Sequence, residues 1–198
     1  MSHTQRVRRL LAIVAVLSCS ASMACKSGDP LSADTAPATA AFDADTVPPA
    51  VQERYVAFRA GSIEGGRITL DVVVTEVGDP VAGLALRLAY PASFARFVRC
   101  LDGDLLPAGA CLSSEPATGQ LLIGRSVTGS GQATVVSGSR VMVRLEFLVF
   151  GVGDCTDPAA CRIRIEGQNL GGSDASALLG ITGDPIVVQW FSGVLRGE

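Results

Sequence analysis

The chain has 198 residues, enough for one domain and an additional segment, and its formal net charge is −3. Glycine is frequent, at 22 residues, and aromatic residues make up only 5%, a composition typical of a β-rich domain with many turns. Beyond the N-terminus no basic residues cluster, which argues against nucleic acid as a partner.

Residues 1–24 are predicted to form a bacterial export signal. Arg6, Arg8 and Arg9 precede an apolar run at 10–17, LLAIVAVL, which is too short for a bilayer that needs about 20 residues. Removing these three arginines from the 16 basic residues leaves 13 against 19 acidic ones, a net charge of −6. We therefore expect the exported part of the chain to be acidic.

The end of the signal contains two candidate lipidation sites. Ala24-Cys25 and Ser18-Cys19 both resemble a lipobox, in which the cysteine becomes the lipidated first residue. We predict lipidation at Cys25, because the polar segment 26–30 that follows is typical of lipoproteins; Cys19 and ordinary secretion are the alternatives. Acyl chains would anchor the protein to the cell envelope, facing the periplasm or the cell exterior.

Residues 25–50 are expected to form a disordered tether, rich in Ala, Asp, Thr, Pro and Ser. Apart from Leu31, Phe42 and Val47 the segment has little to bury, so burial cannot offset its ordering entropy. The alternative is that it packs along the domain. The globular domain is predicted to span 51–198, long enough to bury a core.

Apolar and polar residues alternate with a period of two through 67–77 and 84–90, on either side of the turn Gly78-Asp79-Pro80. The strongest alternation is RVMVRLEFLVF at 140–150. Further strands are predicted at 55–59, 94–100, 120–126, 162–166, 186–191 and 194–195, with loops at 101–115, 128–138 (or a weak strand there) and 171–179. Turn signals separate these segments and no stretch requires a helix, which indicates an all-β sandwich.

Four cysteines remain in the domain: Cys100, Cys111, Cys155 and Cys161. They allow three pairings, and we expect Cys100–Cys111 and Cys155–Cys161, each of which closes one loop. Export permits disulfides. A metal site is the weaker alternative, because neither pair has C-x-x-C spacing and no histidine accompanies them.

The domain has no histidine, since His3 lies in the signal, so no Ser-His-Asp or Cys-His system can form. Asp102 and Asp104, and likewise Asp154 and Asp157, pair up in Gly- or Pro-containing loops where aspartate is ordinary turn chemistry. We therefore expect no catalysis, no metal and no cofactor. Calcium on these carboxylates is the remaining alternative, although no EF-hand loop is present.

Three arginines at strand positions, Arg87, Arg125 and Arg144, are expected to point outward and to form a partner-binding face. Trp190 is the only tryptophan. We expect it in the core, because the last strand of a sandwich normally lies within a sheet; the alternative is an exposed ring that stacks on a sugar.

The run from 66 to 106 resembles a bacterial cohesin module. The likeness lies in the Gly-initiated alternating strand, the entry Val81-Ala82-Gly83, the segment LRLAYPASF and GDLLP at 103–107. GQLLIGRS, VMVRLEFLVFG and IVVQWFSGVL continue the order of elements, so the resemblance covers about 61–195. Cohesins are jelly-roll β-sandwiches of about nine strands.

The resemblance implies a function as well as a fold, because cohesins bind dockerin modules on one sheet face and related sandwiches bind carbohydrate. The family's Tyr-Asp-Pro corner is Tyr90-Pro91 here, and Ala85, Arg87 and Ala89 lack the Asn/Asp character common in dockerin-binding cohesins. We therefore expect a non-catalytic envelope lipoprotein that binds a protein partner, dockerin-like or other. A carbohydrate-binding module holding polysaccharide at the cell surface and a structural envelope protein are the alternatives.

Overall fold

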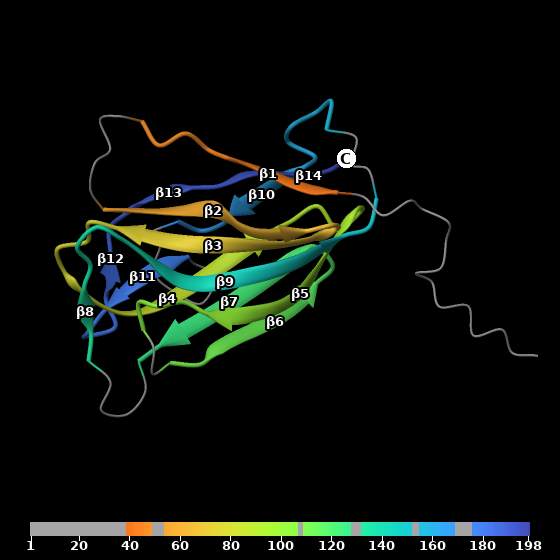
Figure 1. Cartoon of the computed structure of the whole chain (residues 1–198). Coiled ribbons are helices and arrows are strands. Elements are labelled where there is room, and N and C mark those ends of the chain that lie inside the picture. The colour runs from red at the N-terminus through yellow and green to blue at the C-terminus, as the bar shows by residue number, and fades with distance from the viewer. Residues whose placement is uncertain (1–38, 49–53, 107–108, 128–131, 152–154, 169–175) are drawn as a thin grey trace, which may run out of the picture. The chain divides into compact units, whose positions relative to one another are not determined.

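The computed structural model describes residues 39–48, 54–106, 109–127, 132–151, 155–168 and 176–198 (Figure 1). The export signal, both candidate lipidation cysteines and most of the expected tether lie outside these residues. Within them every regular element is a strand, and no helix is long and apolar enough to cross a membrane. All of these strands belong to one compact unit, Asp34–Glu198.

The strands, in chain order, are β1 (Ala40–Ala44), β2 (Tyr55–Glu64), β3 (Arg67–Thr75), β4 (Pro80–Ala89), β5 (Ala95–Asp102), β6 (Cys111–Ala117), β7 (Gln120–Ser126), β8 (Thr134–Val135), β9 (Ser139–Val149), β10 (Arg162–Ile165), β11 (Ala177–Gly180), β12 (Pro185–Ile186), β13 (Gln189–Phe191) and β14 (Gly193–Gly197).

These strands form the two sheets of a β-sandwich (Figure 1). The five-stranded sheet has the order β13-β2-β3-β9-β5, in which β13 runs parallel to β2 and the other neighbours are antiparallel. The nine-stranded sheet follows β1-β14-β10-β4-β11-β12, with β7 and β8 also paired to β4 and β6 paired to β7. The predicted all-β jelly-roll sandwich is therefore confirmed.

The core lies between the sheets and consists of the apolar residues that alternation places on one side of each strand. Leu84, Leu86 and Leu88 of β4 are at most 2% exposed, and Leu145 and Phe147 of β9 are fully buried. Each such side chain contributes about 1.5–3 kcal/mol through burial. Trp190 is 8% exposed and belongs to this core, as the sequence predicts.

A cluster of aromatic rings joins the two sheets at the end of β4. The Tyr90 ring lies edge-on to Phe147, with centroids 5.4 Å apart, and Phe147 contacts Phe97 of β5 at 5.8 Å. The Tyr90 hydroxyl donates a hydrogen bond to the Glu115 carboxylate. Burial, followed by the neighbouring Glu115, raises the pKa of Tyr90 to about 12.

The prediction of a disordered tether is wrong for residues 40–44, because they form β1. This strand pairs antiparallel with β14 over its whole length, so the domain begins before residue 51. Phe42 contacts the Phe58 ring, with centroids 6.4 Å apart, and packs over Gly193, where no side chain would fit. Disorder was expected because this segment has few apolar residues, but Phe42 packs against Phe58, which is distant in sequence.

Two further strands, β6 and β11, lie in segments expected to be loops, and the short β8 lies in the segment 128–138, for which a weak strand was the alternative. The exposed edge strand β6 reads CLSSEPA and shows no apolar alternation, so the sequence carries no strand signal there. The predicted strand at 186–191 is instead two strands, because β12 pairs with β11 in one sheet and β13 pairs with β2 in the other.

Both expected disulfides form. Cys100–Cys111 joins β5 of one sheet to β6 of the other. Cys155–Cys161 closes the turn that precedes β10. The first bond connects the two layers as well as closing a loop, so it holds the exposed strand β6 against the sandwich.

Arg125 points into the sandwich, so the prediction that it points outward is wrong. In register it lies opposite Leu84 of β4, and its side chain is fully buried. The guanidinium donates to the Asp102 carboxylate and to the Leu106 carbonyl oxygen, while its Nε has no partner among the described residues. Period-two alternation places Arg125 on the same side of β7 as Leu121, and that side is the core.

Replacing Arg125 by Ala is expected to lower the free energy of unfolding by about 2–4 kcal/mol, because it leaves a cavity and an unpaired buried carbonyl at Leu106. Arg125→Met should cost less, because an apolar stem still fills the space. Urea denaturation with the disulfides intact measures both. Arg164→Ala, an exposed position on β10, is the control and should change stability by no more than about 0.5 kcal/mol. An Arg125→Ala variant as stable as this control would contradict the assigned role.

The raised pKa of Tyr90 predicts a pH dependence of stability. The unfolded tyrosine ionises at its ordinary pKa of 10.0 and the folded one at about 12. The stabilisation is complete below pH 10 and is lost as the pH rises from 10 to about 12, since the unfolded state releases the proton first. We therefore expect the stability difference between the protein and Tyr90→Phe to shrink over this range in denaturation measured at successive pH values. A constant difference would contradict the prediction.

Candidate functional site

Each sheet turns one side to the core and the other outward, which gives the domain two broad candidate surfaces. We define the β4 face as the outward side of β6, β7, β4 and β11. The β9 face is the outward side of β2, β3, β9 and β5. The three arginines predicted to act together divide between these surfaces and the core, because Arg87 lies on the β4 face, Arg144 on the β9 face and Arg125 inside.

Strand register determines the residues of the β4 face. Arg87 of β4 lies opposite Leu122 of β7, and Ala85 lies opposite Gly124. One strand further, Leu112 of β6 pairs with Gly124. Because opposed residues of antiparallel strands share a side, small residues occupy the centre of this surface.

The β4 face has a shallow depression of about 290 Å³. Leu112 at its edge is 70% exposed, which leaves an apolar side chain open to contact from outside. A Cβ built on Gly124 would have its nearest contact at Leu112, 4.0 Å away, so the centre has room for a side chain from outside. The residues that line the depression are Ala85, Leu86, Arg87, Leu112, Ser113, Ser114, Leu122, Ile123 and Gly124.

Arg87 is the charged group of this depression and is held in place from two sides. Its Nε lies 3.6 Å from the Glu166 carboxylate, and its side chain is 24% exposed. The fully buried Ser176 accepts a hydrogen bond from the Arg87 backbone N–H at 2.9 Å and donates to the Glu166 carbonyl oxygen at 2.7 Å. The fold therefore presents one positioned cation on an otherwise small and apolar surface.

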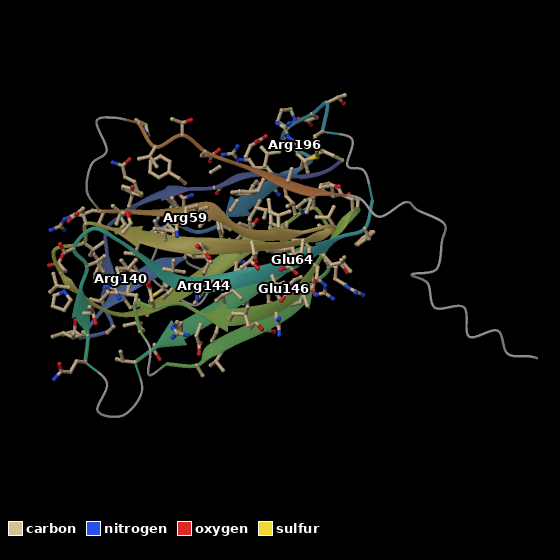
Figure 2. All side chains as sticks on the ribbon, viewed as in Figure 1. Arg59, Glu64, Arg140, Arg144, Glu146 and Arg196 are labelled. Carbon is tan, nitrogen blue, oxygen red and sulfur yellow. A yellow bond between two sulfur atoms is a disulfide. The ribbon has the colours of Figure 1, made fainter. Side chains whose placement is uncertain are left out.

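The β9 face has the opposite character, because charged residues cover it (Figure 2). Asp71 of β3 lies 3.0 Å from the Arg59 guanidinium and 3.4 Å from that of Arg144. Glu146 of β9 lies 2.5 Å from Arg67 and 2.6 Å from Arg99. The hydrogen bond from Arg99 is the main cause that holds the pKa of Glu146 below its usual value, and Arg67 adds to it.

The paired loop carboxylates that the structure describes form hydrogen bonds within the domain. Asp102 binds Arg125, and Asp104 accepts a hydrogen bond from the Val141 backbone N–H at 2.9 Å. Asp157 accepts one from the Ala159 N–H at 2.9 Å, as in an Asx turn, and Asp154 lies outside the described residues. No group of three or more potential metal-ligating side chains occurs within the described ranges.

The sequence correctly places Arg87 on an outward strand position but does not reveal the surface around it. Leu112 and Ser114 fall in a segment without alternation, so β6 and its contribution to the β4 face were missed. A usable signal was present in β4 and β7, where Ala85, Ala89 and Gly124 alternate with buried leucine and isoleucine. Small residues at several outward positions predict a surface that another backbone can approach closely.

No family model matches the sequence, and no curated protein sequence matches it. Solved structures do match. A type II cohesin domain from the cellulosome of Acetivibrio cellulolyticus has a TM-score of 0.54 at 12% identity, over 73% of this chain and 95% of that one.

Two other matches are more distant in structure. The sixth cohesin of Acetivibrio cellulolyticus scaffoldin B, in complex with a Cel5 dockerin mutant, has a TM-score of 0.49 at 13% identity, over 70% of this chain and 95% of that one. A non-cellulosomal cohesin from the archaeon Archaeoglobus fulgidus has a TM-score of 0.46 at 17% identity, over 70% and 88%. At these identities the likeness concerns the fold. With its parallel β13–β2 pair, its two sheets and its match to the type II cohesin over nearly the whole length of that domain, the described part of this chain is a cohesin-like β-sandwich.

Proposed function

We propose that this chain is an exported, lipid-anchored module without catalytic activity, which binds a protein partner through its β4 face. The observation that carries the proposal is the combination of an uncharged, small-residue centre, the exposed Leu112 and the positioned Arg87. The cohesin-like fold supports it, because the resemblance implies a protein-binding sheet face.

The chemistry of the β4 face matches the centre of protein interfaces. Such centres are depleted in charged residues, and arginine is enriched there. Alanine and glycine at Ala85 and Gly124 let a partner's backbone or side chains come close, while Leu112 offers apolar area that is already exposed. Arg87 can then donate hydrogen bonds to a partner carbonyl or carboxylate. Glu166 orients its guanidinium and Ser176 holds its backbone, which lowers the entropic cost of binding.

The partner is proposed to be a dockerin-like module or another protein with a complementary apolar surface. Ala85 and Ala89 offer no hydrogen-bonding side chains where dockerin-binding cohesins commonly have Asn or Asp. We therefore expect apolar contacts to dominate at this position, with Arg87 providing the directional contact.

The described surface fits a neutral polysaccharide less well than it fits a protein partner. Sugar rings stack on exposed aromatic side chains, as bases do in single-stranded nucleic acid sites. Trp190 is buried, and Phe150, at 38% exposed, is the one aromatic side chain among the exposed large apolar residues of the described ranges. This surface therefore offers no planar row of rings.

A substitution at Gly124 tests the proposed face without disturbing the core. Gly124→Arg introduces a large side chain into open space, so the fold should persist while the partner is excluded. Arg87→Glu removes the positioned cation. The wild-type domain is used to capture proteins from the envelope and secreted fractions, and mass spectrometry identifies them. With either variant, the captured amount of the partner should fall at least about tenfold.

Gly78→Arg is the matched control. Gly78 lies in a turn, and its nearest neighbour would be the flexible Arg54 side chain, 3.9 Å away, so capture should be retained. Equal capture by wild type and Gly124→Arg would remove the β4 face from consideration. Loss of capture after glycan digestion would favour carbohydrate recognition instead.

The lipid anchor is tested separately, since it concerns Cys25 rather than the folded domain. Cys25→Ser is expected to move the protein from the membrane fraction to the soluble fraction, because the acyl chains provide the attachment. Mass spectrometry of the mature N-terminal peptide should show an acylated cysteine. Release by Cys19→Ser instead would identify Cys19 as the lipidated residue, and an unmodified N-terminus would indicate ordinary secretion.

A further inference from the structure

We propose that the β9 face is a second, independent binding site, which holds an anionic polysaccharide through the guanidinium groups of Arg67 and Arg99. It lies on the five-stranded sheet, whereas the proposed protein-binding face lies on the nine-stranded one. The two sites have no residue in common.

Three consecutive cross-strand rows form the β9 face. In the first two rows a carboxylate on β3 or β9 lies beside arginine on a neighbouring strand, and in the third row Glu64 of β2 lies beside Arg67 of β3. Rows of this kind are two residues apart along a strand, or about 7 Å. The rows are Arg59, Asp71, Arg144 and Leu101; Thr69, Glu146 and Arg99; and Glu64, Arg67, Leu148 and Arg96.

The arginines on this face are exposed, while the two central carboxylates are covered. The side chains of Asp71 and Glu146 are 10% and 8% exposed, whereas those of Arg67 and Arg99 are 54% and 62% exposed. An approaching ligand therefore meets guanidinium groups first. This cationic surface occurs on a chain whose net charge is −3.

Glu146 holds the two arginines in fixed positions. Arg67 uses Nη1 and Arg99 uses Nε to donate to its two carboxylate oxygens. A guanidinium has five N–H donors in a fixed fork, so each arginine retains further donors for a ligand. Because the arginines are already ordered by Glu146, an anion that binds them loses less side-chain entropy on binding.

The two arginines border an open depression of about 380 Å³ that has space for a sugar unit. The hydroxyls of Ser62 and Thr69, 3.2 Å apart, line it and can hydrogen-bond to sugar hydroxyls. Glu64 also lines it and opposes Arg67 in register. Its carboxylate repels an anion at that end, so the negative group of the ligand is expected to lie nearer Arg99.

A polysaccharide fits this surface better than an acidic protein does. The rows contain Leu101 and Leu148 as their apolar members, and both are half-buried, so the face lacks the desolvated apolar centre of a specific protein interface. A polymer with repeated carboxylate groups can engage arginines of several rows at once. Such multivalent binding raises the overall affinity without an apolar contact.

Affinity electrophoresis of the full chain through gels that contain polygalacturonate tests the proposal, with neutral dextran as the reference polymer. Retardation is expected with polygalacturonate and not with dextran, and it should weaken as ionic strength rises because screening weakens exposed charge pairs. The double variant Arg67→Gln/Arg99→Gln should bind at least about tenfold more weakly. Arg164→Gln, the same change at an exposed position of the nine-stranded sheet, should stay within about twofold of wild type.

Two further variants separate ligand binding from folding. Glu64→Gln removes the repelling carboxylate and should tighten binding by about twofold or more, which a purely structural role would not produce. Arg67→Lys/Arg99→Lys keeps the charges beside Glu146, so it remains informative if the glutamine variant does not fold. It should weaken binding by about threefold or more, because lysine lacks the planar fork.

The proposal fails if the protein is not retarded by polygalacturonate, or if dextran retards it equally. It also fails if the glutamine and lysine double variants bind as well as Arg164→Gln does. Retardation of equal strength by poly-L-glutamate, lost in the same variants, would assign the face to acidic proteins. Binding to phosphatidylglycerol vesicles in place of the polysaccharide would assign it to a membrane surface.

Discussion

The two sheets are held together by the burial of their inner faces, and this constraint decides what each outer face can carry. Once Leu84, Leu86 and Leu88 of β4 point into the core, Ala85 and Arg87 must point outward, because side chains alternate along a strand. The same rule on β9 buries Leu145 and Phe147. Apolar burial is the dominant favourable term in folding, so the two proposed binding faces consist of the strand positions that do not contribute to the core.

Polar groups inside or near the core show how the fold accommodates charge under this constraint. Arg125 is fully buried, yet two of its nitrogens reach oxygens at the edge of the sandwich, those of Asp102 and Leu106. Glu146, on the outer side of β9, is nearly as inaccessible because two arginines cover it. In both cases hydrogen bonds replace much of the hydration that the charged group loses on burial, although the Arg125 Nε has no partner among the described residues. Each buried charge therefore also holds the residues that hydrogen-bond to it in fixed positions.

Local sequence was sufficient for the features that depend on neighbouring residues. The alternating stretches in β3, β4 and β9 and both disulfide pairings follow from spacing within short segments, and the core position of Trp190 follows from its place in the last strands of a sandwich. The features that were missed depend on pairing and packing between strands. β1 exists because Phe42 packs near Phe58 and its backbone pairs with β14 at the other end of the chain, and β6 is a strand because β7 lies beside it. Arg125, Arg87 and Arg144 were predicted to act together, but alternation along β7 places Arg125 in the core, and sheet topology assigns Arg87 and Arg144 to two different faces.

The strand order separates β1, the first strand of the described chain, from the β4 face. β1, where the chain enters the domain, pairs with β14, and β14 and β10 separate it from β4. The β4 face extends from β4 toward β7 and β6, at the other side of the same sheet. The β9 face belongs to the second sheet. Because the two proposed sites lie on different sheets and share no residue, a partner on one face need not displace a ligand on the other.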